Sequence, residues 1–588
     1  MRFTKAARLA AAIAIFCVLF TALSPRTGMA AQAATGELTP ADIAVLDPAD
    51  VERYQKIFDI QESGQMARAD LLIRDLRNPV LMGYVLFQRY MHPTAYHSRY
   101  DELYSWMAQY SDLPGATRIY ALAVKRRPKS AASPARPQPR TFRARASDAL
   151  ETPTPRRMSS KVERIASKVR ELVRNERPTQ ALGYLQQKSV QRALGKNEAD
   201  DLTSLVASSY YAEGKADMAY ALSSDVATRN RREVPLADWT AGLSAWRMGD
   251  RETAAGHFEA LANASTVSGS ARAAGAFWAA RAYLSNRKPQ KVGPLLERAA
   301  DSAHSFYGVL ATRQLGRDLP FEWTTPVLTR SDFQELAQEP AVLRAIAFVQ
   351  IGDPSSAEDE LFRIHGRIPD RLEPAFLALA NTLNLPAIQL EAAECLSASG
   401  YDSGRYPVPS YAPSGGFDVD PALLYAFMHQ ESRFKVGAES GSGARGLMQL
   451  MPRTASHVAD DPTLAHGDKD RLLDPETNLT IAQDYLKTLM GMVEPRGNLF
   501  MLAVAYNGGP GNLSRWRRSL NIDDDPLLFI ESIPAAETRA YIERVLTNYW
   551  AYRDRLDGSD PTLDEAAANE WPVYNDTNVV TSGPKGRR

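Results

Sequence analysis

The chain has 588 residues, with 69 Lys and Arg side chains against 69 Asp and Glu, so its formal net charge is zero. Hydrophobic residues make up 44% and charged residues 23%, which is ordinary for a globular protein, and the length predicts several domains. A balanced charge gives no reason to expect nucleic acid as a partner, because nucleic-acid-binding domains usually carry a basic excess.

The first thirty residues have the layout of a signal peptide. Arg2, Lys5 and Arg8 give a basic start, Leu9–Leu23 is almost wholly apolar, and small residues follow at 28–31. This apolar run is shorter than the roughly 20 residues that a membrane-spanning helix needs. We therefore expect residues 1–30 to be cleaved and the protein to be exported to the periplasm. The alternative is an uncleaved anchor, or association with the outer membrane.

The cysteine content excludes several kinds of site. The chain contains only Cys17 and Cys395, and only Cys395 remains once residues 1–30 are removed. One cysteine allows neither an intrachain disulfide nor a CxxC zinc site. His429 and Glu431 form an H-x-E pair, but the cysteine ligands that accompany it in zinc deaminases are missing, and there is no HExxH motif. The sequence thus predicts no metal and no other cofactor.

Two segments with contrasting composition follow the signal peptide. Residues 31–127 carry apolar side chains at three- and four-residue spacing, which predicts helices. Between residues 125 and 160 there are six prolines and ten Lys or Arg against two acids. Such a segment buries too little apolar area to order itself, so residues 128–160 are predicted to be a flexible basic linker. The linker would suit contact with an anionic surface, and a solvated spacer is the simpler interpretation.

Residues 161–405 are rich in alanine and contain a repeat. Helix ends are followed by turn residues and a second helix at Gly214, Gly249, Asn286 and Gly352, which are 35, 37 and 66 residues apart. Periods near 34 are typical of stacked helix pairs, and Gly or Asn suits a helix end because it tolerates the left-handed conformation. We expect an α-superhelical array. A Pro- and Gly-rich junction near 405–416 then leads to a compact helical unit at 415–560 and a polar tail at 561–588.

The helix that opens the last unit carries an unusual carboxyl. Asp420 and Pro421 predict a helix start, and the apolar positions 424, 427 and 428 are followed on the same face by Glu431. Burial and the nearby helix C-terminus both favour the protonated acid. A carboxyl that is protonated near neutral pH can act as a general acid. An ion pair with a nearby arginine is the alternative.

Three further segments carry candidate site residues, and the first of them suits binding of a sugar. "GARGLMQLMP" at 443–452 presents Gln449, which can both donate and accept hydrogen bonds, beside Met448 and Met451, which offer pliable apolar surface or fill the core. "AYNGGPG" places Tyr506 and Asn507 at a helix end. "ETRAY" places Glu537 and Tyr541 on one helix face, four residues apart.

In this order, "ESRF", "GARGLMQLMP", "AYNGGPGN" and "ETRAY" closely resemble the soluble lytic murein transglycosylases over about 130 residues. The repeat region, notably "AHSFYGVLATRQLG" at 303–316, is also similar to that family. The resemblance implies an all-α fold, in which an α-superhelical array precedes a goose-lysozyme-like catalytic domain. It implies peptidoglycan as the substrate, cut between N-acetylmuramic acid and N-acetylglucosamine with a 1,6-anhydro product. The basic linker would then contact an anionic surface or a wall protein.

The resemblance also assigns roles to residues. Glu431 would be the only catalytic acid/base, and Glu537 would support the substrate groove. The glycan would be bound by Ser440, Met448, Gln449, Met451, Tyr506, Asn507 and Tyr541.

Two alternatives remain open. Glu439, beside Ser440, is an acid at a position where the family pattern does not lead us to expect one. It would make the protein a muramidase-type hydrolase if it activated water, because ordinary glycosidases use a pair of carboxyls. The second alternative is a non-catalytic scaffold that recruits other cell-wall proteins through its helical repeats.

Overall fold

The computed structural model describes residues 37–141, 159–396, 400–493, 496–520, 522, 524–556 and 560–574. Within these ranges the chain is helical and has no strand, only the isolated bridges Glu439–Arg445, Arg445–Leu450 and Asn498–Val573. The predicted all-α class is confirmed. No helix in the described ranges is both long and apolar enough to cross a bilayer. The predicted signal peptide, 1–30, lies outside them.

The chain divides into two compact units, each built from two stretches of sequence. The first unit comprises residues 1–145 and 324–410, and the second comprises 146–323 and 411–588. The predicted repeat domain, 161–405, is therefore shared between them. Repeat periodicity identifies helix pairs but carries no information on which pairs pack into one unit.

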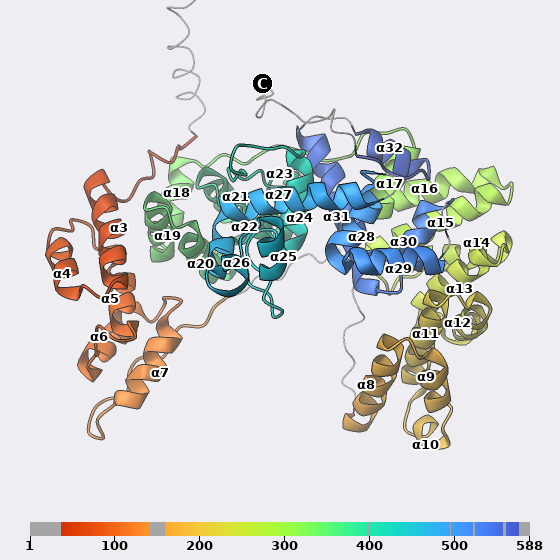
Figure 1. The fold of residues 1–588 in the computed structure, drawn as a ribbon, viewed down its shortest axis with the longest axis horizontal. Coiled ribbons are helices and arrows are strands. Elements are labelled where there is room, and N and C mark those ends of the chain that lie inside the picture. The colour runs from red at the N-terminus through yellow and green to blue at the C-terminus, as the bar shows by residue number, and fades with distance from the viewer. Residues whose placement is uncertain are drawn as a thin grey trace, which may run out of the picture. The chain divides into compact units, whose positions relative to one another are not determined.

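The first unit contains the helices shown in red, orange and mid-green in Figure 1. They are α3 (Pro48–Glu62), α4 (Met66–Arg74), α5 (Met82–Met91), α6 (Tyr100–Tyr110), α7 (Ala116–Arg126), α18 (Arg330–Leu336), α19 (Pro340–Gln350), α20 (Pro354–Ile364), η2 (His365–Arg367), η3 (Asp370–Leu372), α21 (Glu373–Thr382), α22 (Pro386–Cys395) and α23 (Asp402–Arg405). Arg344 joins its two stretches: the guanidinium lies 2.6 Å from Asp112 and 2.8 Å from Glu360, both through charge-assisted hydrogen bonds.

The first part of the predicted linker, residues 128–141, lies against this unit. The Gln138 backbone amide donates to the Ser111 carbonyl at 2.8 Å, and the Thr141 hydroxyl donates to the Arg363 carbonyl at 2.9 Å. These contacts differ from the prediction of a flexible segment, because backbone hydrogen bonds replace the apolar burial that the composition lacks. Residues 142–158 lie outside the described ranges, so the rest of the linker remains a prediction.

The second unit begins with helical hairpins and ends with the predicted compact domain. Its helices are α8 (Ser160–Arg174), α9 (Pro178–Leu185), α10 (Lys188–Gln191), α11 (Lys196–Ala212), α12 (Ala216–Asn230), α13 (Leu236–Arg247), α14 (Arg251–Ala262), α15 (Gly269–Ser285), η1 (Pro289–Lys291), α16 (Val292–Ala300), α17 (Phe306–Gln314), α24 (Pro421–Glu431), α25 (Pro452–Val458), α26 (Thr463–His466), η4 (Lys469–Leu473), α27 (Pro475–Met492), α28 (Leu499–Gly508), α29 (Pro510–Leu520), α30 (Pro526–Ser532), α31 (Ala536–Leu556) and α32 (Pro561–Ala567).

The helices α11 to α16 stack one on the next in sequence order, as the yellow and light-green helices of Figure 1 show. Gly214, Gly249 and Gly352 adopt positive φ angles of 78°, 85° and 86° at helix ends, as predicted. The prediction for Asn286 is wrong by one residue: Asn286 caps α15 with a negative φ, and Arg287 takes the left-handed conformation with φ 58°. Asn tolerates the left-handed conformation better than Arg does, yet Arg287 and not Asn286 adopts it, so residue type alone did not locate the turn.

Within the second unit, α17 packs against the last helices of the chain. Phe306 stacks on Trp550 with ring centroids 5.6 Å apart, and the Tyr307 hydroxyl donates to the Glu531 carboxylate. Tyr211 of α11 and Ser532 of α30 share a hydrogen bond of 3.1 Å. These buried contacts fix α30 and α31 on the hairpin array.

The predicted polar tail, 561–588, is wrong for residues 561–574. Pro561 begins α32, which Asp560 caps by accepting from the Thr562 amide at 2.8 Å. The segment continues to Tyr574, whose hydroxyl accepts a hydrogen bond from the Asp420 amide at 2.9 Å. The composition is polar, but buried polar partners elsewhere in the domain hold this segment in place. Residues 575–588 lie outside the described ranges.

Candidate active site

Helix α24 begins as the sequence predicts. Asp420 is the N-cap, its carboxylate accepts from the Ala422 amide at 2.9 Å, and Pro421 occupies the first turn. Asp420 is also fully buried, with Arg553 of α31 at 2.8 Å. Burial raises the pKa of Asp420, and Arg553 opposes that shift. This ion pair therefore joins the start of α24 to α31, the helix that packs along it (Figure 1).

Helix α24 ends at Glu431 because the next residues leave the helical conformation. Ser432 is the C-cap, and its hydroxyl donates to the Met428 carbonyl at 3.2 Å. Arg433 and Phe434 then take positive φ angles of 53° and 63°, which is uncommon for side chains of this size. Buried Phe434 anchors the turn. The strained turn and its anchor fix where the Glu431 side chain emerges.

The helix is more buried than its apolar spacing suggested. All residues from Ala422 to Met428 are buried, so α24 is a central helix of the domain and has no solvent-facing side over this stretch. Glu431 is only partly buried. The carboxyl thus stands at the point where a core helix approaches the surface.

Glu431 accepts one strong hydrogen bond from the neighbouring helix. The Tyr541 hydroxyl of α31 donates to Glu431 Oε1 at 2.6 Å. Burial raises the pKa of Glu431 to about 7, and the Tyr541 hydrogen bond limits this rise. Burial and Tyr541 account for the pKa of Glu431, and no arginine contributes to it. The predicted alternative, an ion pair between Glu431 and an arginine, is therefore wrong for this structure. At neutral pH the acid and carboxylate forms are both populated.

The glycine-rich segment that follows is held by one buried amide. Asn478 of α27 accepts from the Met448 amide at 2.8 Å and donates to the carbonyls of Arg445 and Leu472 at 3.0 and 2.9 Å. A side chain at Gly446, which has φ 75°, would meet the Leu472 carbonyl oxygen at 2.1 Å. Glycine is required at this position by both its conformation and its surroundings.

Two of the predicted binding residues also shape this segment. Gln449 has φ 47°, and its side-chain amide donates to the carbonyls of Ala438 and Gly446 at 3.0 and 2.9 Å. The Ser440 hydroxyl is exposed and accepts from the Ala444 amide at 2.9 Å. Both side chains therefore have structural partners already, and Ser440 keeps its exposure to solvent.

The two methionines have different environments. Met448 is completely buried, so the prediction that its side chain contacts a sugar is wrong for this structure: it fills the core. Met451 is 43% exposed, so its side chain offers apolar surface at the end of the same segment. Helix α25 begins directly after Met451.

Tyr506 and Asn507 lie at the end of α28, as predicted. The Tyr506 hydroxyl donates to the Met448 carbonyl at 2.8 Å, and its ring packs against Phe427 of α24 at 4.7 Å between centroids. Exposed Asn507 accepts a hydrogen bond of 2.7 Å from the Thr538 hydroxyl. The structure thus brings α24, α28 and α31 together around Phe427, which also packs on Tyr541.

The remaining two predictions in this region concern Glu537 and His429. Glu537 is exposed in the first turn of α31, and the contact to Asn507 that supports the site comes from its neighbour Thr538 instead. His429 is half-buried and packs against Phe434 and Tyr552, and burial lowers its pKa to about 3. His429 is thus a neutral packing residue.

Glu439 has an arginine partner that the sequence did not reveal. Both carboxylate oxygens of Glu439 lie 3.1 Å from the Arg445 guanidinium, which also pairs with Asp470 at 2.6 Å. Arg445 is buried, and its backbone forms bridges to Glu439 and Leu450. The two parallel contacts fix the orientation of this carboxylate on the loop.

This part of the chain matches a known family. Residues 411–527 match the family model described as "Transglycosylase SLT domain". We call this stretch the SLT domain after the family model that it matches. The match includes Glu431, Ser440, Gln449 and Asn507, and it ends before α31, which supplies Tyr541.

Curated relatives are similar to about a quarter of this chain. A soluble lytic murein transglycosylase of Escherichia coli K12 is 36% identical over 159 residues, which are 27% of this chain and 24% of the relative. The Salmonella typhimurium protein of the same name is 34% identical over 157 residues, or 26% and 24% of the two chains. The membrane-bound lytic murein transglycosylase C of Serratia proteamaculans is 31% identical over 157 residues, or 24% and 44%. These matches span less than half of each relative.

Solved structures are similar over much more of the chain, at lower identity. An inactive mutant of the lytic transglycosylase Slt from Pseudomonas aeruginosa has a TM-score of 0.54 and 18% identity, covering 86% of this chain and 81% of its own. The 70-kDa soluble lytic transglycosylase of Escherichia coli has a TM-score of 0.51 and 17% identity, covering 90% and 99%. The SLT domain and its helical array therefore share the fold of these enzymes.

Several residues around the SLT domain's carboxyl escaped the sequence reasoning. Asn478, Thr538 and Arg445 each hold a segment that carries predicted site residues. Asn478 is 30 residues from Met448, and Thr538 is 31 residues from Asn507, so no local spacing links these pairs. Arg445 lies on the same loop as its partner Glu439, where helical spacing does not apply. One sequence pattern could have identified Asn478: it is a polar residue on the apolar face of the helix that becomes α27.

Proposed function

We propose that the protein is a peptidoglycan lytic transglycosylase that cleaves the β-1,4 bond between N-acetylmuramic acid and N-acetylglucosamine and forms a 1,6-anhydro end. The curated relatives that this chain matches are named for action on murein. The observation that carries the proposal is Glu431, a partly buried carboxyl with its pKa raised to about 7 and oriented by Tyr541.

One carboxyl is sufficient for the proposed reaction. Protonated Glu431 gives its proton to the glycosidic oxygen as the bond to C1 of the muramyl sugar breaks. The carboxylate then accepts the proton of that sugar's C6 hydroxyl as O6 forms the new bond to C1. Glu431 begins and ends protonated, and no water is consumed. A pKa near the working pH suits a group that must both give and accept a proton.

The environment of Glu439 argues against the hydrolase alternative. A second carboxyl would need to hold water beside C1, about 5–9 Å from the acid. Glu439 is instead held by both guanidinium contacts of Arg445 at 3.1 Å. Both oxygens that would have to hold the water are therefore directed at the guanidinium.

Substrate contacts in this proposal come from the surface around Glu431. Exposed Asn507, Met451 and Ser440, with partly buried Gln449 and Tyr506, would bind the glycan. Tyr541, which is buried, would act on the sugar only through Glu431. Export to the periplasm follows from the same proposal, because the substrate lies in the cell envelope. The basic linker at 128–160 would contact an anionic surface or a wall protein.

The test compares two isosteric variants in clearing of purified sacculi. Glu431→Gln is expected to lower the rate about a hundredfold or more, because it removes the proton donor. Glu439→Gln is the matched control and should clear sacculi at nearly the wild-type rate. Far-UV circular dichroism confirms that both variants are folded. Clearing by Glu431→Gln at nearly the wild-type rate would refute the assignment of Glu431. If neither wild type nor Glu431→Gln cleared sacculi, the non-catalytic scaffold would be favoured.

A further inference from the structure

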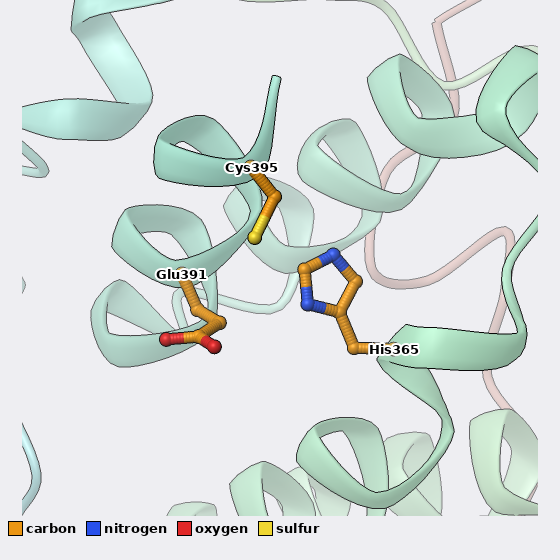
Figure 2. A group of neighbouring side chains, drawn as sticks. All are labelled: His365, Glu391 and Cys395. Atoms are coloured by element: carbon orange, nitrogen blue, oxygen red, sulfur yellow. The ribbon is translucent and has the colours of Figure 1, made fainter. Parts of the chain in front are cut away.

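Three side chains of the first unit that can bind metal ions meet outside the SLT domain. His365 begins the short helix η2, and Glu391 and Cys395 come from α22. Glu391 and Cys395 are four residues apart, so they lie on the same face of that helix. Figure 2 shows both of them directed at the His365 ring, and one ligand atom from each lies within 4.8 Å of the other two.

The His365 ring is fixed in orientation by two buried neighbours. Its Nε2 lies 2.9 Å from Glu373 Oε2, and both side chains are almost fully buried. The Phe376 ring stacks on it, with an interplanar angle of 9° and centroids 5.1 Å apart. In the tautomer that this contact favours, the Nε2–H donates a hydrogen bond to the Glu373 carboxylate, and Nδ1 carries the ring's lone pair.

That lone pair is directed into the cluster. In Figure 2 the ring edge that carries Nδ1 faces Glu391 and Cys395. Within the described ranges His365 Nδ1 is buried and has no hydrogen-bond partner. A buried polar atom without a partner is unfavourable, so the unpaired Nδ1 at this position needs an explanation. A bound cation would supply it.

We propose that His365, Glu391 and Cys395 bind a zinc ion. Imidazole nitrogen, thiolate sulfur and carboxylate oxygen are the three ligand types that zinc takes in proteins. The hard cations calcium and magnesium need six or more oxygen ligands and do not suit this set. Tetrahedral zinc with bonds of about 2.0–2.3 Å holds its ligand atoms about 3.5 Å apart, so side-chain rotation closes the site.

The surroundings of the three ligands fit this assignment. A histidine ligand whose other nitrogen bonds to a carboxylate is the usual arrangement at zinc, because the carboxylate fixes the tautomer and strengthens the ligand. Glu373 stands in that position. One thiolate and one carboxylate balance the double charge of the ion, and water would complete the fourth position.

The site would act as a cross-link in the first unit. It connects η2, directly after α20, to the last turn of α22, which ends at Cys395. The three ligands are held together only in the folded protein. Zinc therefore binds the folded state in preference to the unfolded chain and raises the free energy of unfolding. The ligands are 26 and 4 residues apart in sequence. Such spacing matches no zinc motif, which is why the sequence predicted no metal.

The test uses the full-length, untagged protein with Cys17→Ser in every preparation, so that Cys395 is the only thiol. Metal-free protein is titrated with Co²⁺, and the thiolate-to-cobalt absorption in the near ultraviolet is followed. Zn²⁺ is then added to displace cobalt. The expected result is one equivalent of each metal. Zinc should also slow modification of Cys395 by a disulfide reagent at least tenfold, a readout that requires no ligand variant.

Two ligand variants and one control identify the site. Cys395→Ser should abolish the thiolate band, and Glu391→Gln should weaken zinc binding at least tenfold. Glu394→Gln, on the same turn of α22, should change neither. Unchanged zinc affinity in Cys395→Ser, an adventitious ion only, would overturn the proposal. Zinc that leaves the thiol fully reactive in the parent protein would overturn it too.

Discussion

The Tyr541 hydroxyl and the Glu431 carboxylate form a hydrogen bond of 2.6 Å between two packed helices, α31 and α24. Burial raises the pKa of Glu431 to about 7, and the tyrosine opposes the rise because it stabilises the carboxylate. The pair thus sets the direction of the Glu431 carboxyl and, in the proposed mechanism, the pH at which it holds its proton.

Replacing Tyr541 by Phe should shift the pH dependence of sacculus cleavage. Loss of the donor raises the pKa of Glu431, and the reaction begins with the protonated acid. Activity lost as pH rises through about 7 in wild type should therefore persist to higher pH in Tyr541→Phe. The maximal rate should fall about tenfold, because the carboxyl is less well positioned. Initial rates between pH 5 and 9 give both quantities.

Tyr549→Phe is the matched control, since Tyr549 lies on the same helix and its hydroxyl is near Asp420 instead. Its alkaline limb should match that of wild type. A Tyr541→Phe limb displaced to lower pH would contradict the role given to this hydrogen bond.

Thr538→Val should weaken substrate binding more than it slows the chemical step. The variant keeps its shape but loses the 2.7 Å hydrogen bond that fixes exposed Asn507. We expect KM for soluble glycan fragments to rise several-fold, with kcat within about a factor of two. Thr547→Val, whose hydroxyl bonds only to the backbone of α31, is the control. A fall in kcat at constant KM would show that Thr538 acts on the reacting atoms.

Asn478→Ala should destabilise the second unit. The change leaves the Met448 amide and the carbonyls of Arg445 and Leu472 without partners in a buried position. A loss of about 3 kcal/mol is expected, which for a domain of this size lowers Tm by roughly 6–12 °C. Calorimetry on Asn478→Ala and on Thr488→Ala, an exposed position of the same helix, provides the comparison. Equal Tm values would contradict the role of Asn478.

A buried carboxyl pair should make the contact between α17 and the last helices sensitive to pH. Glu531 bonds to Tyr307 and to Glu543, and burial together with the Glu531 charge raises the pKa of Glu543 to about 8. The folded pKa lies above the unfolded value of 4.5, so the stabilisation is complete below about 4.5 and is lost as pH rises to about 8.

Glu543→Gln removes this dependence. Its Tm should equal that of wild type near pH 4.5 and exceed it by several degrees at pH 8. Glu537→Gln, exposed on the same helix, should behave as wild type at both pH values. If wild type and Glu543→Gln lost stability in parallel between these pH values, Glu543 would not be the group responsible.

The sequence predicted the helix start at Asp420, the position of Glu431 and the helix end that presents Asn507, because each depends on neighbours within one or two turns. Met448 was predicted less well. The apolar residues of a short loop do not show which side chain faces the core. The orientation of Met448 depends on the hydrogen bond from its backbone amide to Asn478, which is 30 residues away in sequence. The Glu439–Arg445 pair was missed because the loop's fold, rather than helical spacing, brings the two together.

Residues far apart in sequence were beyond prediction for the same reason. Tyr307 and Glu531 meet only because α17 packs against the last helices of the chain, and no local pattern links them. His365 and Cys395 meet because α20 and α22 are neighbours in the first unit. Repeat periodicity predicted that helices pair, while the side chains between the pairs determined how they join.

Cleavage of sacculi in oxygen-18 water tests the central claim most directly. If Glu431 alone gives and accepts the proton and the sugar's own C6 hydroxyl attacks, the products carry anhydro-muramyl ends with no oxygen-18. Their masses are then one water lower than those of reducing ends. Reducing muramyl ends that carry one oxygen-18 atom would show that water is the nucleophile and would contradict the single-carboxyl mechanism.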